Sequence, residues 1–380
     1  MALRLRDVTG WMDSRYDPAW ADDWDAVGLV CGDPDQAVHR ILFAVDPAPA
    51  VVEEAVSWGA DLLVVHHPLL LKPVSSVAAD YPKGRTLHTL MQAGCALFTA
   101  HTNADAPAAG VSESLAKALG VVDPEPIVAE AGERLDKLVT FVPHEHAEAL
   151  RRAITEAGAG SIGDYDSCTF TTEGEGRFRP LDGATPAIGR VGEVEVVAES
   201  RIESVFPRSR RRQVVEAMLT VHPYEEPAYD VFEFADLAAA GRATRGDGRI
   251  GRLGTPMSLR AFADQVGAVL PATAHGVRVA GDPDRVIETV AVTGGAGDFL
   301  LDTVLRTAAD VYVTSDLRHH RASEFLEHDG PALVDVAHWA AEWTWLPVLE
   351  EALVATLDTG GDTVETRVST TCTDPWSFRV

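Results

Sequence analysis

The feature that most constrains the fold of this chain is an internal repeat of a strand–helix–strand pattern. Each copy ends in a pair of histidines and continues into another apolar strand, followed by His-x-x-x-Asp or His-x-x-x-Glu. The repeated segments are residues 43–46, 51–58 and 59–67, matched by 290–293, 299–307 and 308–320. Strand–helix–strand order is common in α/β proteins, so chance similarity is the alternative. The shared order of histidines favours duplicated βαβ-type halves that form one domain.

The first histidine pair, His66-His67, ends an aliphatic run that is typical of a buried strand. Open α/β sheets bind their ligands at the carboxyl ends of such strands. Much later in the chain, His338 and Glu342 stand at a spacing that puts both on one face of a helix. Imidazole and carboxylate groups are ligands for zinc, iron, manganese and cobalt. The sequence therefore predicts a divalent-metal site assembled from both halves of the chain.

A region of different character separates the two halves. Its predicted strands and helices follow one another in the order β-α-β-β-α-β, so it is expected to have the ferredoxin-like fold. These elements are strands at 137–142, 166–172, 194–204 and 229–234, with helices at 144–157 and 210–220. Flanks rich in Gly, Pro and charge, at 123–126 and 241–248, are expected to be linkers. The predicted organisation is a metal-binding domain in two parts, 1–130 and 248–380, with an inserted α+β domain at 135–240.

The charge of the chain limits its partners. Acidic residues outnumber basic ones by 58 to 32, which gives a formal net charge of −26. Such a field repels phosphate backbones and anionic lipids, so neither nucleic acid nor a membrane is an expected partner. The only basic run, Arg208-Ser-Arg-Arg-Arg212, is more typical of a solvated helix start than of a docking surface.

Cysteine usage and the N-terminus bear on location. The four cysteines are scattered and form no C-x-x-C pair, which favours a reducing compartment over a disulfide framework. The first residues lack the apolar core of a signal peptide, and no apolar run approaches the roughly 20 residues of a membrane span. We therefore expect a soluble, cytoplasmic protein.

Seven stretches, in this order, resemble the landmarks of the GTP cyclohydrolase 1 type 2 homologue family, also described as the NIF-three-like, dinuclear-metal-centre family. They are Trp24-Asp-Ala-Val-Gly-Leu29, His66-His-Pro68, His101-Thr-Asn-Ala-Asp105, His222-Pro-Tyr-Glu-Glu-Pro-Ala-Tyr-Asp230, Gly248-Arg-Ile-Gly251, Thr314-Ser-Asp316 with His319-His320, and His338-x-x-x-Glu342. The resemblance spans nearly the whole chain and implies an α/β fold, a homohexameric ring, and an insert similar to PII and CutA proteins. One departure is Ser315, where glycine is expected.

The resemblance also implies the cofactors and their ligands. Two divalent ions per subunit are expected, with zinc or iron ahead of manganese or cobalt. The matching ligand positions are His66, His67, Asp105, His338 and Glu342, and Glu342 is expected to bridge the ions. His101 matches a position close to the metals and is a further candidate ligand.

Several of these residues also have a purely structural interpretation. The pair His66-His67 could end a strand and bond to nearby backbone, and Asp105 could cap a helix. Likewise, His338 and Glu342 could be an ordinary pair on a helix surface, although tryptophans at 339, 343 and 345 indicate an enclosed helix.

Three further residues are assigned to the pocket or to the layer behind the ligands, namely Asp316, His319 and His320. For the two histidines, the alternative is that they are simply polar residues at the amino end of a helix over 318–328. The segment His222 to Glu226 in the insert is expected to be a structural turn.

Two function classes are compatible with the sequence. The first is a metal-dependent hydrolase, in which paired ions lower the pKa of water and polarise a substrate oxygen; the family name points to a GTP-ring hydrolase by resemblance only. The second is a metal-binding regulatory or scaffold protein without turnover, whose insert responds to an effector. Five ligands shared by two ions would leave coordination positions open, which favours catalysis. The sequence specifies neither the catalytic residues nor the substrate, the physiological metal or the effector.

Overall fold

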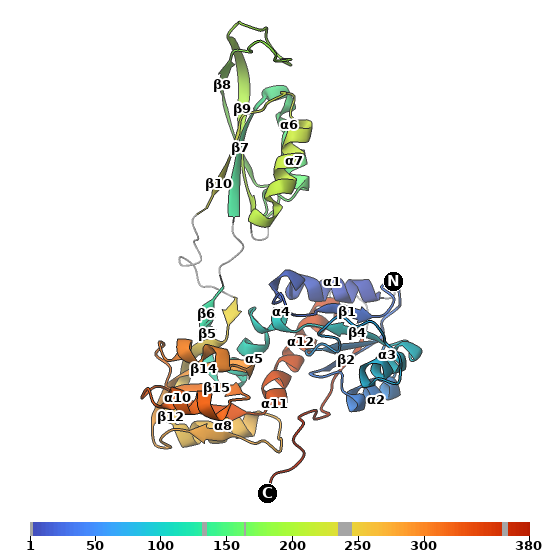
Figure 1. Ribbon diagram of the computed structural model, residues 1–380, viewed down its shortest axis with the longest axis vertical. Helices are drawn as coiled ribbons and strands as arrows, with labels where there is room; N and C mark the ends of the chain where they lie inside the picture. The colour runs from blue at the N-terminus through green and yellow to red at the C-terminus, as the bar shows by residue number, and fades with distance from the viewer. Residues whose placement is uncertain (1–2, 131–134, 163–164, 235–244, 359–363) are drawn as a thin grey trace. The chain divides into compact units, whose positions relative to one another are not determined.

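The computed structural model describes residues 3–130, 135–162, 165–234, 245–358 and 364–380. The chain divides into two compact units. Unit 1 comprises Met1–Glu130 and Ala243–Val380, and unit 2 comprises Ala131–Arg242. Each unit contains both helices and sheets, so the fold is mixed α/β (Figure 1). None of the described helices is long and apolar enough to cross a membrane.

The first sheet of unit 1 has the strand order β1-β4-β3-β2-β17. Its strands are β1 (Gly28–Cys31), β2 (Arg40–Ala44), β3 (Leu62–Val65), β4 (Ala96–Thr99) and β17 (Glu365–Val368). Strands β17, β2, β3 and β4 run parallel, and β1 is antiparallel to β4. Alternate residues of β2 enter different cores, Ile41 and Phe43 on one face and Leu42 and Ala44 on the other. A parallel strand covered on both faces reads as a continuous apolar run, as the sequence here does.

Helices cover both faces of this sheet. They are α1 (Leu5–Arg15), α2 (Pro49–Trp58), α3 (Pro82–Gln92), α4 (Thr102–Asp105) and α5 (Val111–Ala118), with a 3₁₀ turn η1 (Pro18–Trp20). The core under α2 and α3 is separate from the one under α1 and α5. Helix α2 begins with a proline in its first turn and ends at Gly59, whose φ of 73° suits the left-handed cap.

The second sheet of unit 1 has the order β13-β16-β15-β14-β12-β5. Its strands are β5 (Val121–Glu125), β12 (Arg249–Ser258), β13 (Arg278–Ala280), β14 (Val286–Ala296), β15 (Val311–Ser315) and β16 (Ala332–Val336). Strands β14, β15 and β16 run parallel. The prediction of a linker at 123–126 was wrong, because most of it lies in β5, which pairs with β12. Strand β5 lies at the edge of the sheet, with a neighbouring strand among the described residues on one side only. Such a strand can accommodate Pro124, which has no N–H group to donate to a neighbour.

The helices of the second half are α8 (Leu259–Val269), α9 (Leu301–Val304), α10 (His319–Leu326), α11 (His338–Trp343) and α12 (Trp345–Asp358), with η4 (Asp298–Leu300) before α9. The helix predicted at 299–307 is therefore shorter than expected. Helices α5, α11 and α12 lie between the two sheets (Figure 1). Their side chains Leu115, Trp345 and Leu349 share one core with Phe43 of the first sheet and Val292 of the second. This shared core holds the strand ends of both sheets close together.

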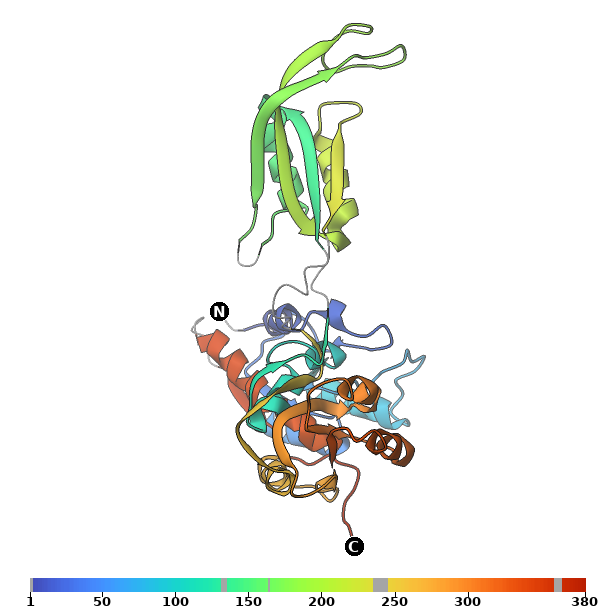
Figure 2. The same ribbon diagram turned by 90° about the vertical axis from the view of Figure 1, so that its left-hand side faces the viewer.

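Unit 2 is a four-stranded antiparallel sheet with two helices on one face (Figures 1 and 2). In chain order its elements are β7 (Leu135–Pro143), η2 (His144–His146), α6 (Ala147–Glu156), β8 (Thr169–Phe178), β9 (Glu195–Pro207), η3 (Arg208–Arg210), α7 (Arg211–Val221) and β10 (Tyr229–Glu233). The sheet order is β10-β7-β9-β8, and Leu138, Ile202 and Phe206 pack under the helices. Strand β8 runs six residues beyond the predicted end, through Gly174 and Gly176.

Short strands β6 (Val128–Ala129) and β11 (Gly246–Asp247) pair where the chain leaves and re-enters unit 1. Part of the expected linker at 241–248 lies outside the described residues.

The basic run at 208–212 does start a helix, and Arg208 and Arg211 bind the buried carboxylate of Asp136, so these two arginines are engaged within unit 2.

Candidate metal centre

The predicted ligands follow the carboxyl ends of three strands in unit 1. His66 and His67 come directly after β3, and His338 opens α11 just after β16. His101 comes just after β4, and Asp105 ends the short helix α4 that follows. Because β3 and β4 are adjacent and parallel, their tips lie at one edge of the first sheet. The shared core then places the tip of β16 against this edge.

Glu342 lies at the centre of the cluster, with its side chain only 4% exposed. Its Oε1 is 2.8 Å from His338 Nε2 and 3.5 Å from His66 Nε2. Its Oε2 is 3.1 Å from His67 Nε2, although not in hydrogen-bond geometry. Both carboxylate oxygens are therefore directed at imidazole nitrogens from the two halves of unit 1.

Four imidazoles are held in the same way by groups behind them. In each case Nδ1 lies within hydrogen-bond distance of an acceptor, which fixes the proton on Nδ1 and leaves the Nε2 lone pair free. The pairs are His66 with Ala100 O at 2.8 Å, His67 with Asp46 Oδ1 at 2.7 Å, His101 with Asp25 Oδ1 at 2.9 Å, and His338 with Asp316 Oδ2 at 2.7 Å. This pattern is the one found behind metal-ligating histidines.

Lone pairs facing a carboxylate repel one another unless a cation lies between them. Three buried side-chain atoms of the cluster have no hydrogen-bond partner: His66 Nε2, Asp105 Oδ1 and Glu342 Oε2. Asp105 Oδ1 lies 3.5 Å from His66 Nε2. Leaving such groups unsatisfied costs about 1–3 kcal/mol each, and more for a charged group. The residues present therefore fit a bound divalent metal.

The pKa values show how strongly the cluster attracts positive charge. Burial opposes protonation of His67 and His338, but Glu342 and the carboxylates behind the rings outweigh it and raise the pKa values to about 11 and about 10. Burial alone would raise the pKa of Glu342, yet the surrounding imidazoles hold it well below its ordinary value. Burial raises the pKa of Asp105. The metal-free cluster thus binds protons in place of a metal cation.

Gly295 brings the backbone against the cluster. Its φ is 69°, and a Cβ atom there would lie 2.5 Å from Glu342 Oε1 and 3.2 Å from His338 Nε2. A side chain at this position would occupy the space between the ligands. Glycine is thus needed for backbone conformation and for access to the site.

The structure groups the candidate ligands into two sets. His66, His67 and His101 form one set, and His67, His338 and Glu342 form the other, with the ligand atoms of each set within 4.8 Å of one another. The two sets share His67. Asp105 is placed beside the first set by its distance to His66.

The residues assigned behind the ligands differ in their placement. Asp316 binds His338, as expected of a residue in that layer. Its φ of 57° is left-handed, so the backbone turn falls on Asp316 while Ser315 stays in β15. His319 and His320 are exposed at the start of α10, and their rings meet edge to face with centroids 5.2 Å apart. No contact of either with the metal cluster is seen among the described residues.

Sequence reasoning missed Asp46, Asp25 and Gly295. Asp46 follows β2, which is adjacent and parallel to β3, so its place at the same sheet edge was a usable signal. Asp25 lies in the Trp24-Asp-Ala stretch, and its contact with His101 had no local signal. Trp24 lies beside the same ring, with centroids 5.8 Å apart, and is 57% exposed.

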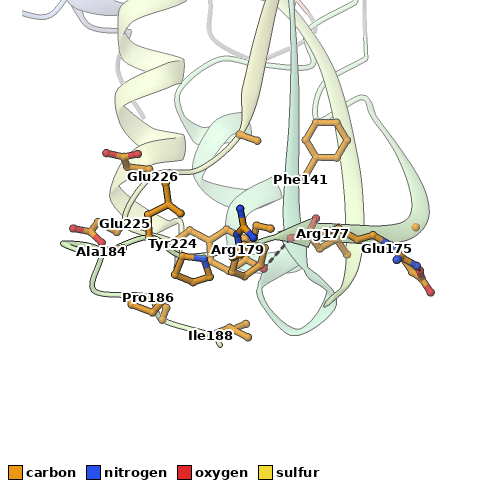
Figure 3. A pocket seen from close by; sticks show the side chains of 18 of the residues that line it. Phe141, Glu175, Arg177, Arg179, Ala184, Pro186, Ile188, Tyr224, Glu225 and Glu226 are labelled. Atoms are coloured by element: carbon orange, nitrogen blue, oxygen red, sulfur yellow. Dashed lines mark hydrogen bonds and ion pairs between the residues drawn. The ribbon is translucent and has the colours of Figure 1, made fainter. Parts of the chain in front are cut away.

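Unit 2 contains a separate cavity of about 830 Å³. Among its lining residues, Tyr224 donates its hydroxyl to Glu199 Oε1 at 2.8 Å, and Glu199 is 7% exposed. A Cβ at Gly176 would collide with this carboxylate, which explains the glycine in β8. In Figure 3, Tyr224 and Arg179 lie centrally, with Glu225 and Glu226 to one side and Glu175 and Arg177 to the other.

The expected turn at 222–226 is present beside this cavity. The backbone N–H of Tyr224 donates to His222 Nδ1 at 3.1 Å, and His222 Nε2 donates to Phe141 O at 2.9 Å. Tyr224, Glu225 and Glu226 of this segment also line the cavity.

Comparisons with known proteins match the whole chain. The family model described as Duf34/NIF3 (NGG1p interacting factor 3) matches residues 3–375. A Mycobacterium tuberculosis protein named GTP cyclohydrolase 1 type 2 homolog is 50% identical, covering 100% of this chain and 98% of its own length. A Bacillus subtilis protein of the same name is 37% identical, with 95% and 94% covered.

Solved structures also match this chain over its whole length. A Bacillus cereus protein related to NIF3 superposes with a TM-score of 0.78 at 35% identity, covering 100% of both chains. A Staphylococcus aureus protein has a TM-score of 0.80 at 26% identity, covering 100% of this chain and 99% of its own. With its sequence matched from end to end, the chain belongs to the Duf34/NIF3 family, whose members include the proteins named GTP cyclohydrolase 1 type 2 homolog.

Proposed function

We propose that this protein binds two divalent metal ions and acts as a metal-dependent hydrolase. The observation that carries the proposal is the convergence of three Nδ1-anchored imidazoles, those of His66, His67 and His338, on the buried carboxylate of Glu342. A fourth anchored imidazole, His101, lies beside His66 and His67. A structural interpretation of the histidines explains the bond of His66 to the backbone oxygen of Ala100. It does not explain why three buried ligand atoms lack partners at the same place.

In this proposal, His66, Asp105 and Glu342 would hold one ion, and His67, His338 and Glu342 would hold the second. His101 is a further ligand of the first ion or a residue that orients the molecule bound to that ion. Such a pair of ions supplies Lewis acidity and lowers the pKa of bound water. The carboxylates Asp46, Asp25 and Asp316 keep the rings in the tautomer that binds a cation. Five ligands leave coordination positions open to a substrate.

The name of the relatives suggests the reaction class, hydrolysis of a ring in a purine nucleotide. The test is a turnover screen of the metal-loaded protein against GTP, other nucleotides, phosphoesters and cyclic amides. A variant with both His66 and His67 changed to alanine serves as the matched control. Turnover that the parent shows and this variant lacks supports the hydrolase. Equal rates in both, or none in either, would contradict it.

The second candidate is a metal-binding regulatory or scaffold protein without turnover, in which unit 2 responds to an effector. The observation that favours it is the cavity in unit 2, which contains a buried carboxylate and none of the metal ligands. This candidate predicts no turnover in the screen, together with saturable binding of a small molecule to the insert.

We also propose an evolutionary and structural interpretation of the units. The pairs β2–β3 and β14–β15 are both parallel and both end at the site, which supports duplicated halves. The order of elements in unit 2 supports a ferredoxin-like insert of the PII and CutA kind.

The cysteines described at 31, 95, 168 and 372 are all free, which supports a reducing, cytoplasmic location.

Metal content follows directly from the proposal. Protein purified without chelator, or reloaded after chelation, is expected to carry close to two divalent ions per chain, with zinc or iron preferred. Elemental analysis of a gel-filtered sample measures this ratio. A ratio of one or zero after reloading would show that the centre is not dinuclear.

Assembly provides another test. The resemblance implies a closed homohexamer, so the particle mass is expected to be about six times the chain mass of 40.7 kDa. Multi-angle light scattering over a hundredfold range of concentration measures it. A monomer that persists across this range would contradict the proposed ring.

A further inference from the structure

The segment that follows β17 presents a row of hydroxyl groups to one side. Ser369, Thr371 and Thr373 alternate with the exposed residues Thr370 and Cys372, as expected for extended chain with a period of two. Ser369 Oγ donates to Glu54 Oε2 at 2.6 Å, and Thr371 Oγ1 donates to the same oxygen at 2.8 Å. Thr373 Oγ1 donates to Asp46 Oδ2. All three hydroxyls therefore bind carboxylates of the first half.

Asp46 is the group that orients His67. Its Oδ1 accepts from His67 Nδ1 at 2.7 Å, while its Oδ2 accepts from Thr373. Each oxygen of this carboxylate therefore has a partner of its own. A carboxylate held at both oxygens cannot rotate about its last bond without losing a hydrogen bond, so the direction of the His67 ring is fixed.

The start of the same segment is attached to the helix that carries the other ligands. The indole Nε1 of Trp343, in α11, donates to the backbone oxygen of Ser369 at 2.8 Å. The backbone N–H of Ser369 donates to Phe43 O at 2.8 Å, extending the β17–β2 ladder by one residue. The segment thus contacts both α11, which bears His338 and Glu342, and the strand that leads to Asp46.

We infer that residues 369–373 form a positioning strap for the metal centre, in which Thr373 is a positioning residue that fixes Asp46 and through it His67. The inference rests on the proposed metal-binding function and adds a role for the C-terminal segment. The hydroxyl of Thr373 is needed because it is the one of the three that binds Asp46. An apolar residue of equal size would leave that carboxylate oxygen without its donor.

The test compares Thr373→Val with three other variants of the full chain. Valine keeps the shape of threonine and removes the hydroxyl, and Thr373→Ser restores the hydroxyl. Thr370→Val is the matched control, since Thr370 is exposed on the opposite side of the strap. Thr371→Val removes a strap hydroxyl that binds Glu54 and does not touch Asp46.

Zinc affinity by competition with a chromogenic chelator, and the visible absorption of the cobalt-loaded protein, are the measurements. Thr373→Val is expected to weaken one of the two sites about tenfold, at the low end of the effect of groups behind metal ligands, and to change the cobalt spectrum. Thr373→Ser, Thr370→Val and Thr371→Val are expected to bind like the parent. Thermal melting of the metal-free proteins checks that all are folded.

The outcomes separate the two proposals. If the parent takes up no ion, the proposed function fails and the strap has no centre to position. If the parent binds two ions and Thr373→Val binds them with unchanged affinity and spectrum, only the strap inference fails. It also fails if Thr371→Val weakens zinc binding as much as Thr373→Val does, because general docking of the segment would then account for both.

Discussion

Replacing Glu342 with glutamine is expected to reduce the metal content from two ions per chain to nearly none. The side chain is buried, and its carboxylate lies near imidazoles assigned to both ions: His66 for one, and His67 and His338 for the other. Two cations held about 3.5–4 Å apart repel each other strongly, and a carboxylate between them offsets this repulsion. Glutamine keeps the size of the side chain and removes its charge. Both positions should therefore lose affinity together.

The comparison variants make this result specific. His66→Ala removes a ligand of one position and is expected to weaken mainly that ion. Glu351→Gln, an exposed carboxylate on α12, is the matched charge control and should retain both ions. Elemental analysis and thermal melting of the three variants are the measurements. Loss of a single ion from both Glu342→Gln and His66→Ala would show that Glu342 is a terminal ligand and not a bridge.

Arg249→Met is expected to lower the free energy of unfolding of unit 1 by about 3–5 kcal/mol, the cost of removing one partner from a buried charged network. The Arg249 side chain is fully buried. Its Nη1 donates to the backbone oxygens of Gly246 and Gly248 at 2.8 and 2.7 Å. Its Nη2 donates to those of Ala106 and Pro107 at 2.7 and 2.8 Å. Methionine fills similar space but removes one donor from each of the four carbonyls. Two of the four, those of Ala106 and Pro107, also accept from a backbone N–H group.

The Arg249 guanidinium also connects two segments of unit 1. It joins the loop after Asp105 to the segment in which the chain re-enters unit 1. Arg249→Lys should recover only part of the loss, because an ammonium group cannot span two pairs of carbonyls as the planar fork does. Arg252→Met is the matched control, since Arg252 lies on the same strand with its side chain 70% exposed.

Denaturant unfolding followed by tryptophan fluorescence is the measurement. All eight tryptophans of the sequence lie in the segments of unit 1, so the signal reports that unit alone. A change of less than about 1 kcal/mol in the metal-free Arg249→Met protein, within the range of ordinary surface substitutions, would contradict this role for Arg249.

Prediction from the sequence worked best where the pattern was local. The aliphatic run before His66 forms β3, and the residues after it lie at the strand tip. His338 and Glu342 lie on one helix, as their spacing predicted. Prediction failed at residues 123–126, where proline and charge suggested a linker. Pairing with β12 turned the segment into an edge strand, which no local pattern could reveal.

The assignment of groups behind the ligands was less complete. Asp316 was identified because it lies in a landmark stretch, and it does bind His338. His319 and His320 stand in the same landmark stretch, and the sequence leaves open whether they line the pocket or are polar residues at the start of a helix. The structure puts them on the exposed start of α10, since the left-handed turn at Asp316 directs that carboxylate to the site while the chain continues into α10.

By itself, the sequence determined which residue types stand at the ends of buried strands, and so the chemistry of the site: imidazole and carboxylate in an order that both halves share. These features depend on contacts between near neighbours in the chain. Only the tertiary structure decided that Asp46, Gly295, Arg249 and Thr373 serve the site or its support. Each acts through a partner far away in sequence, and such contacts exist only after the two sheets share one core. Thr373 and Asp46, separated by 327 positions, are joined by a single hydrogen bond that no local pattern of residues could indicate.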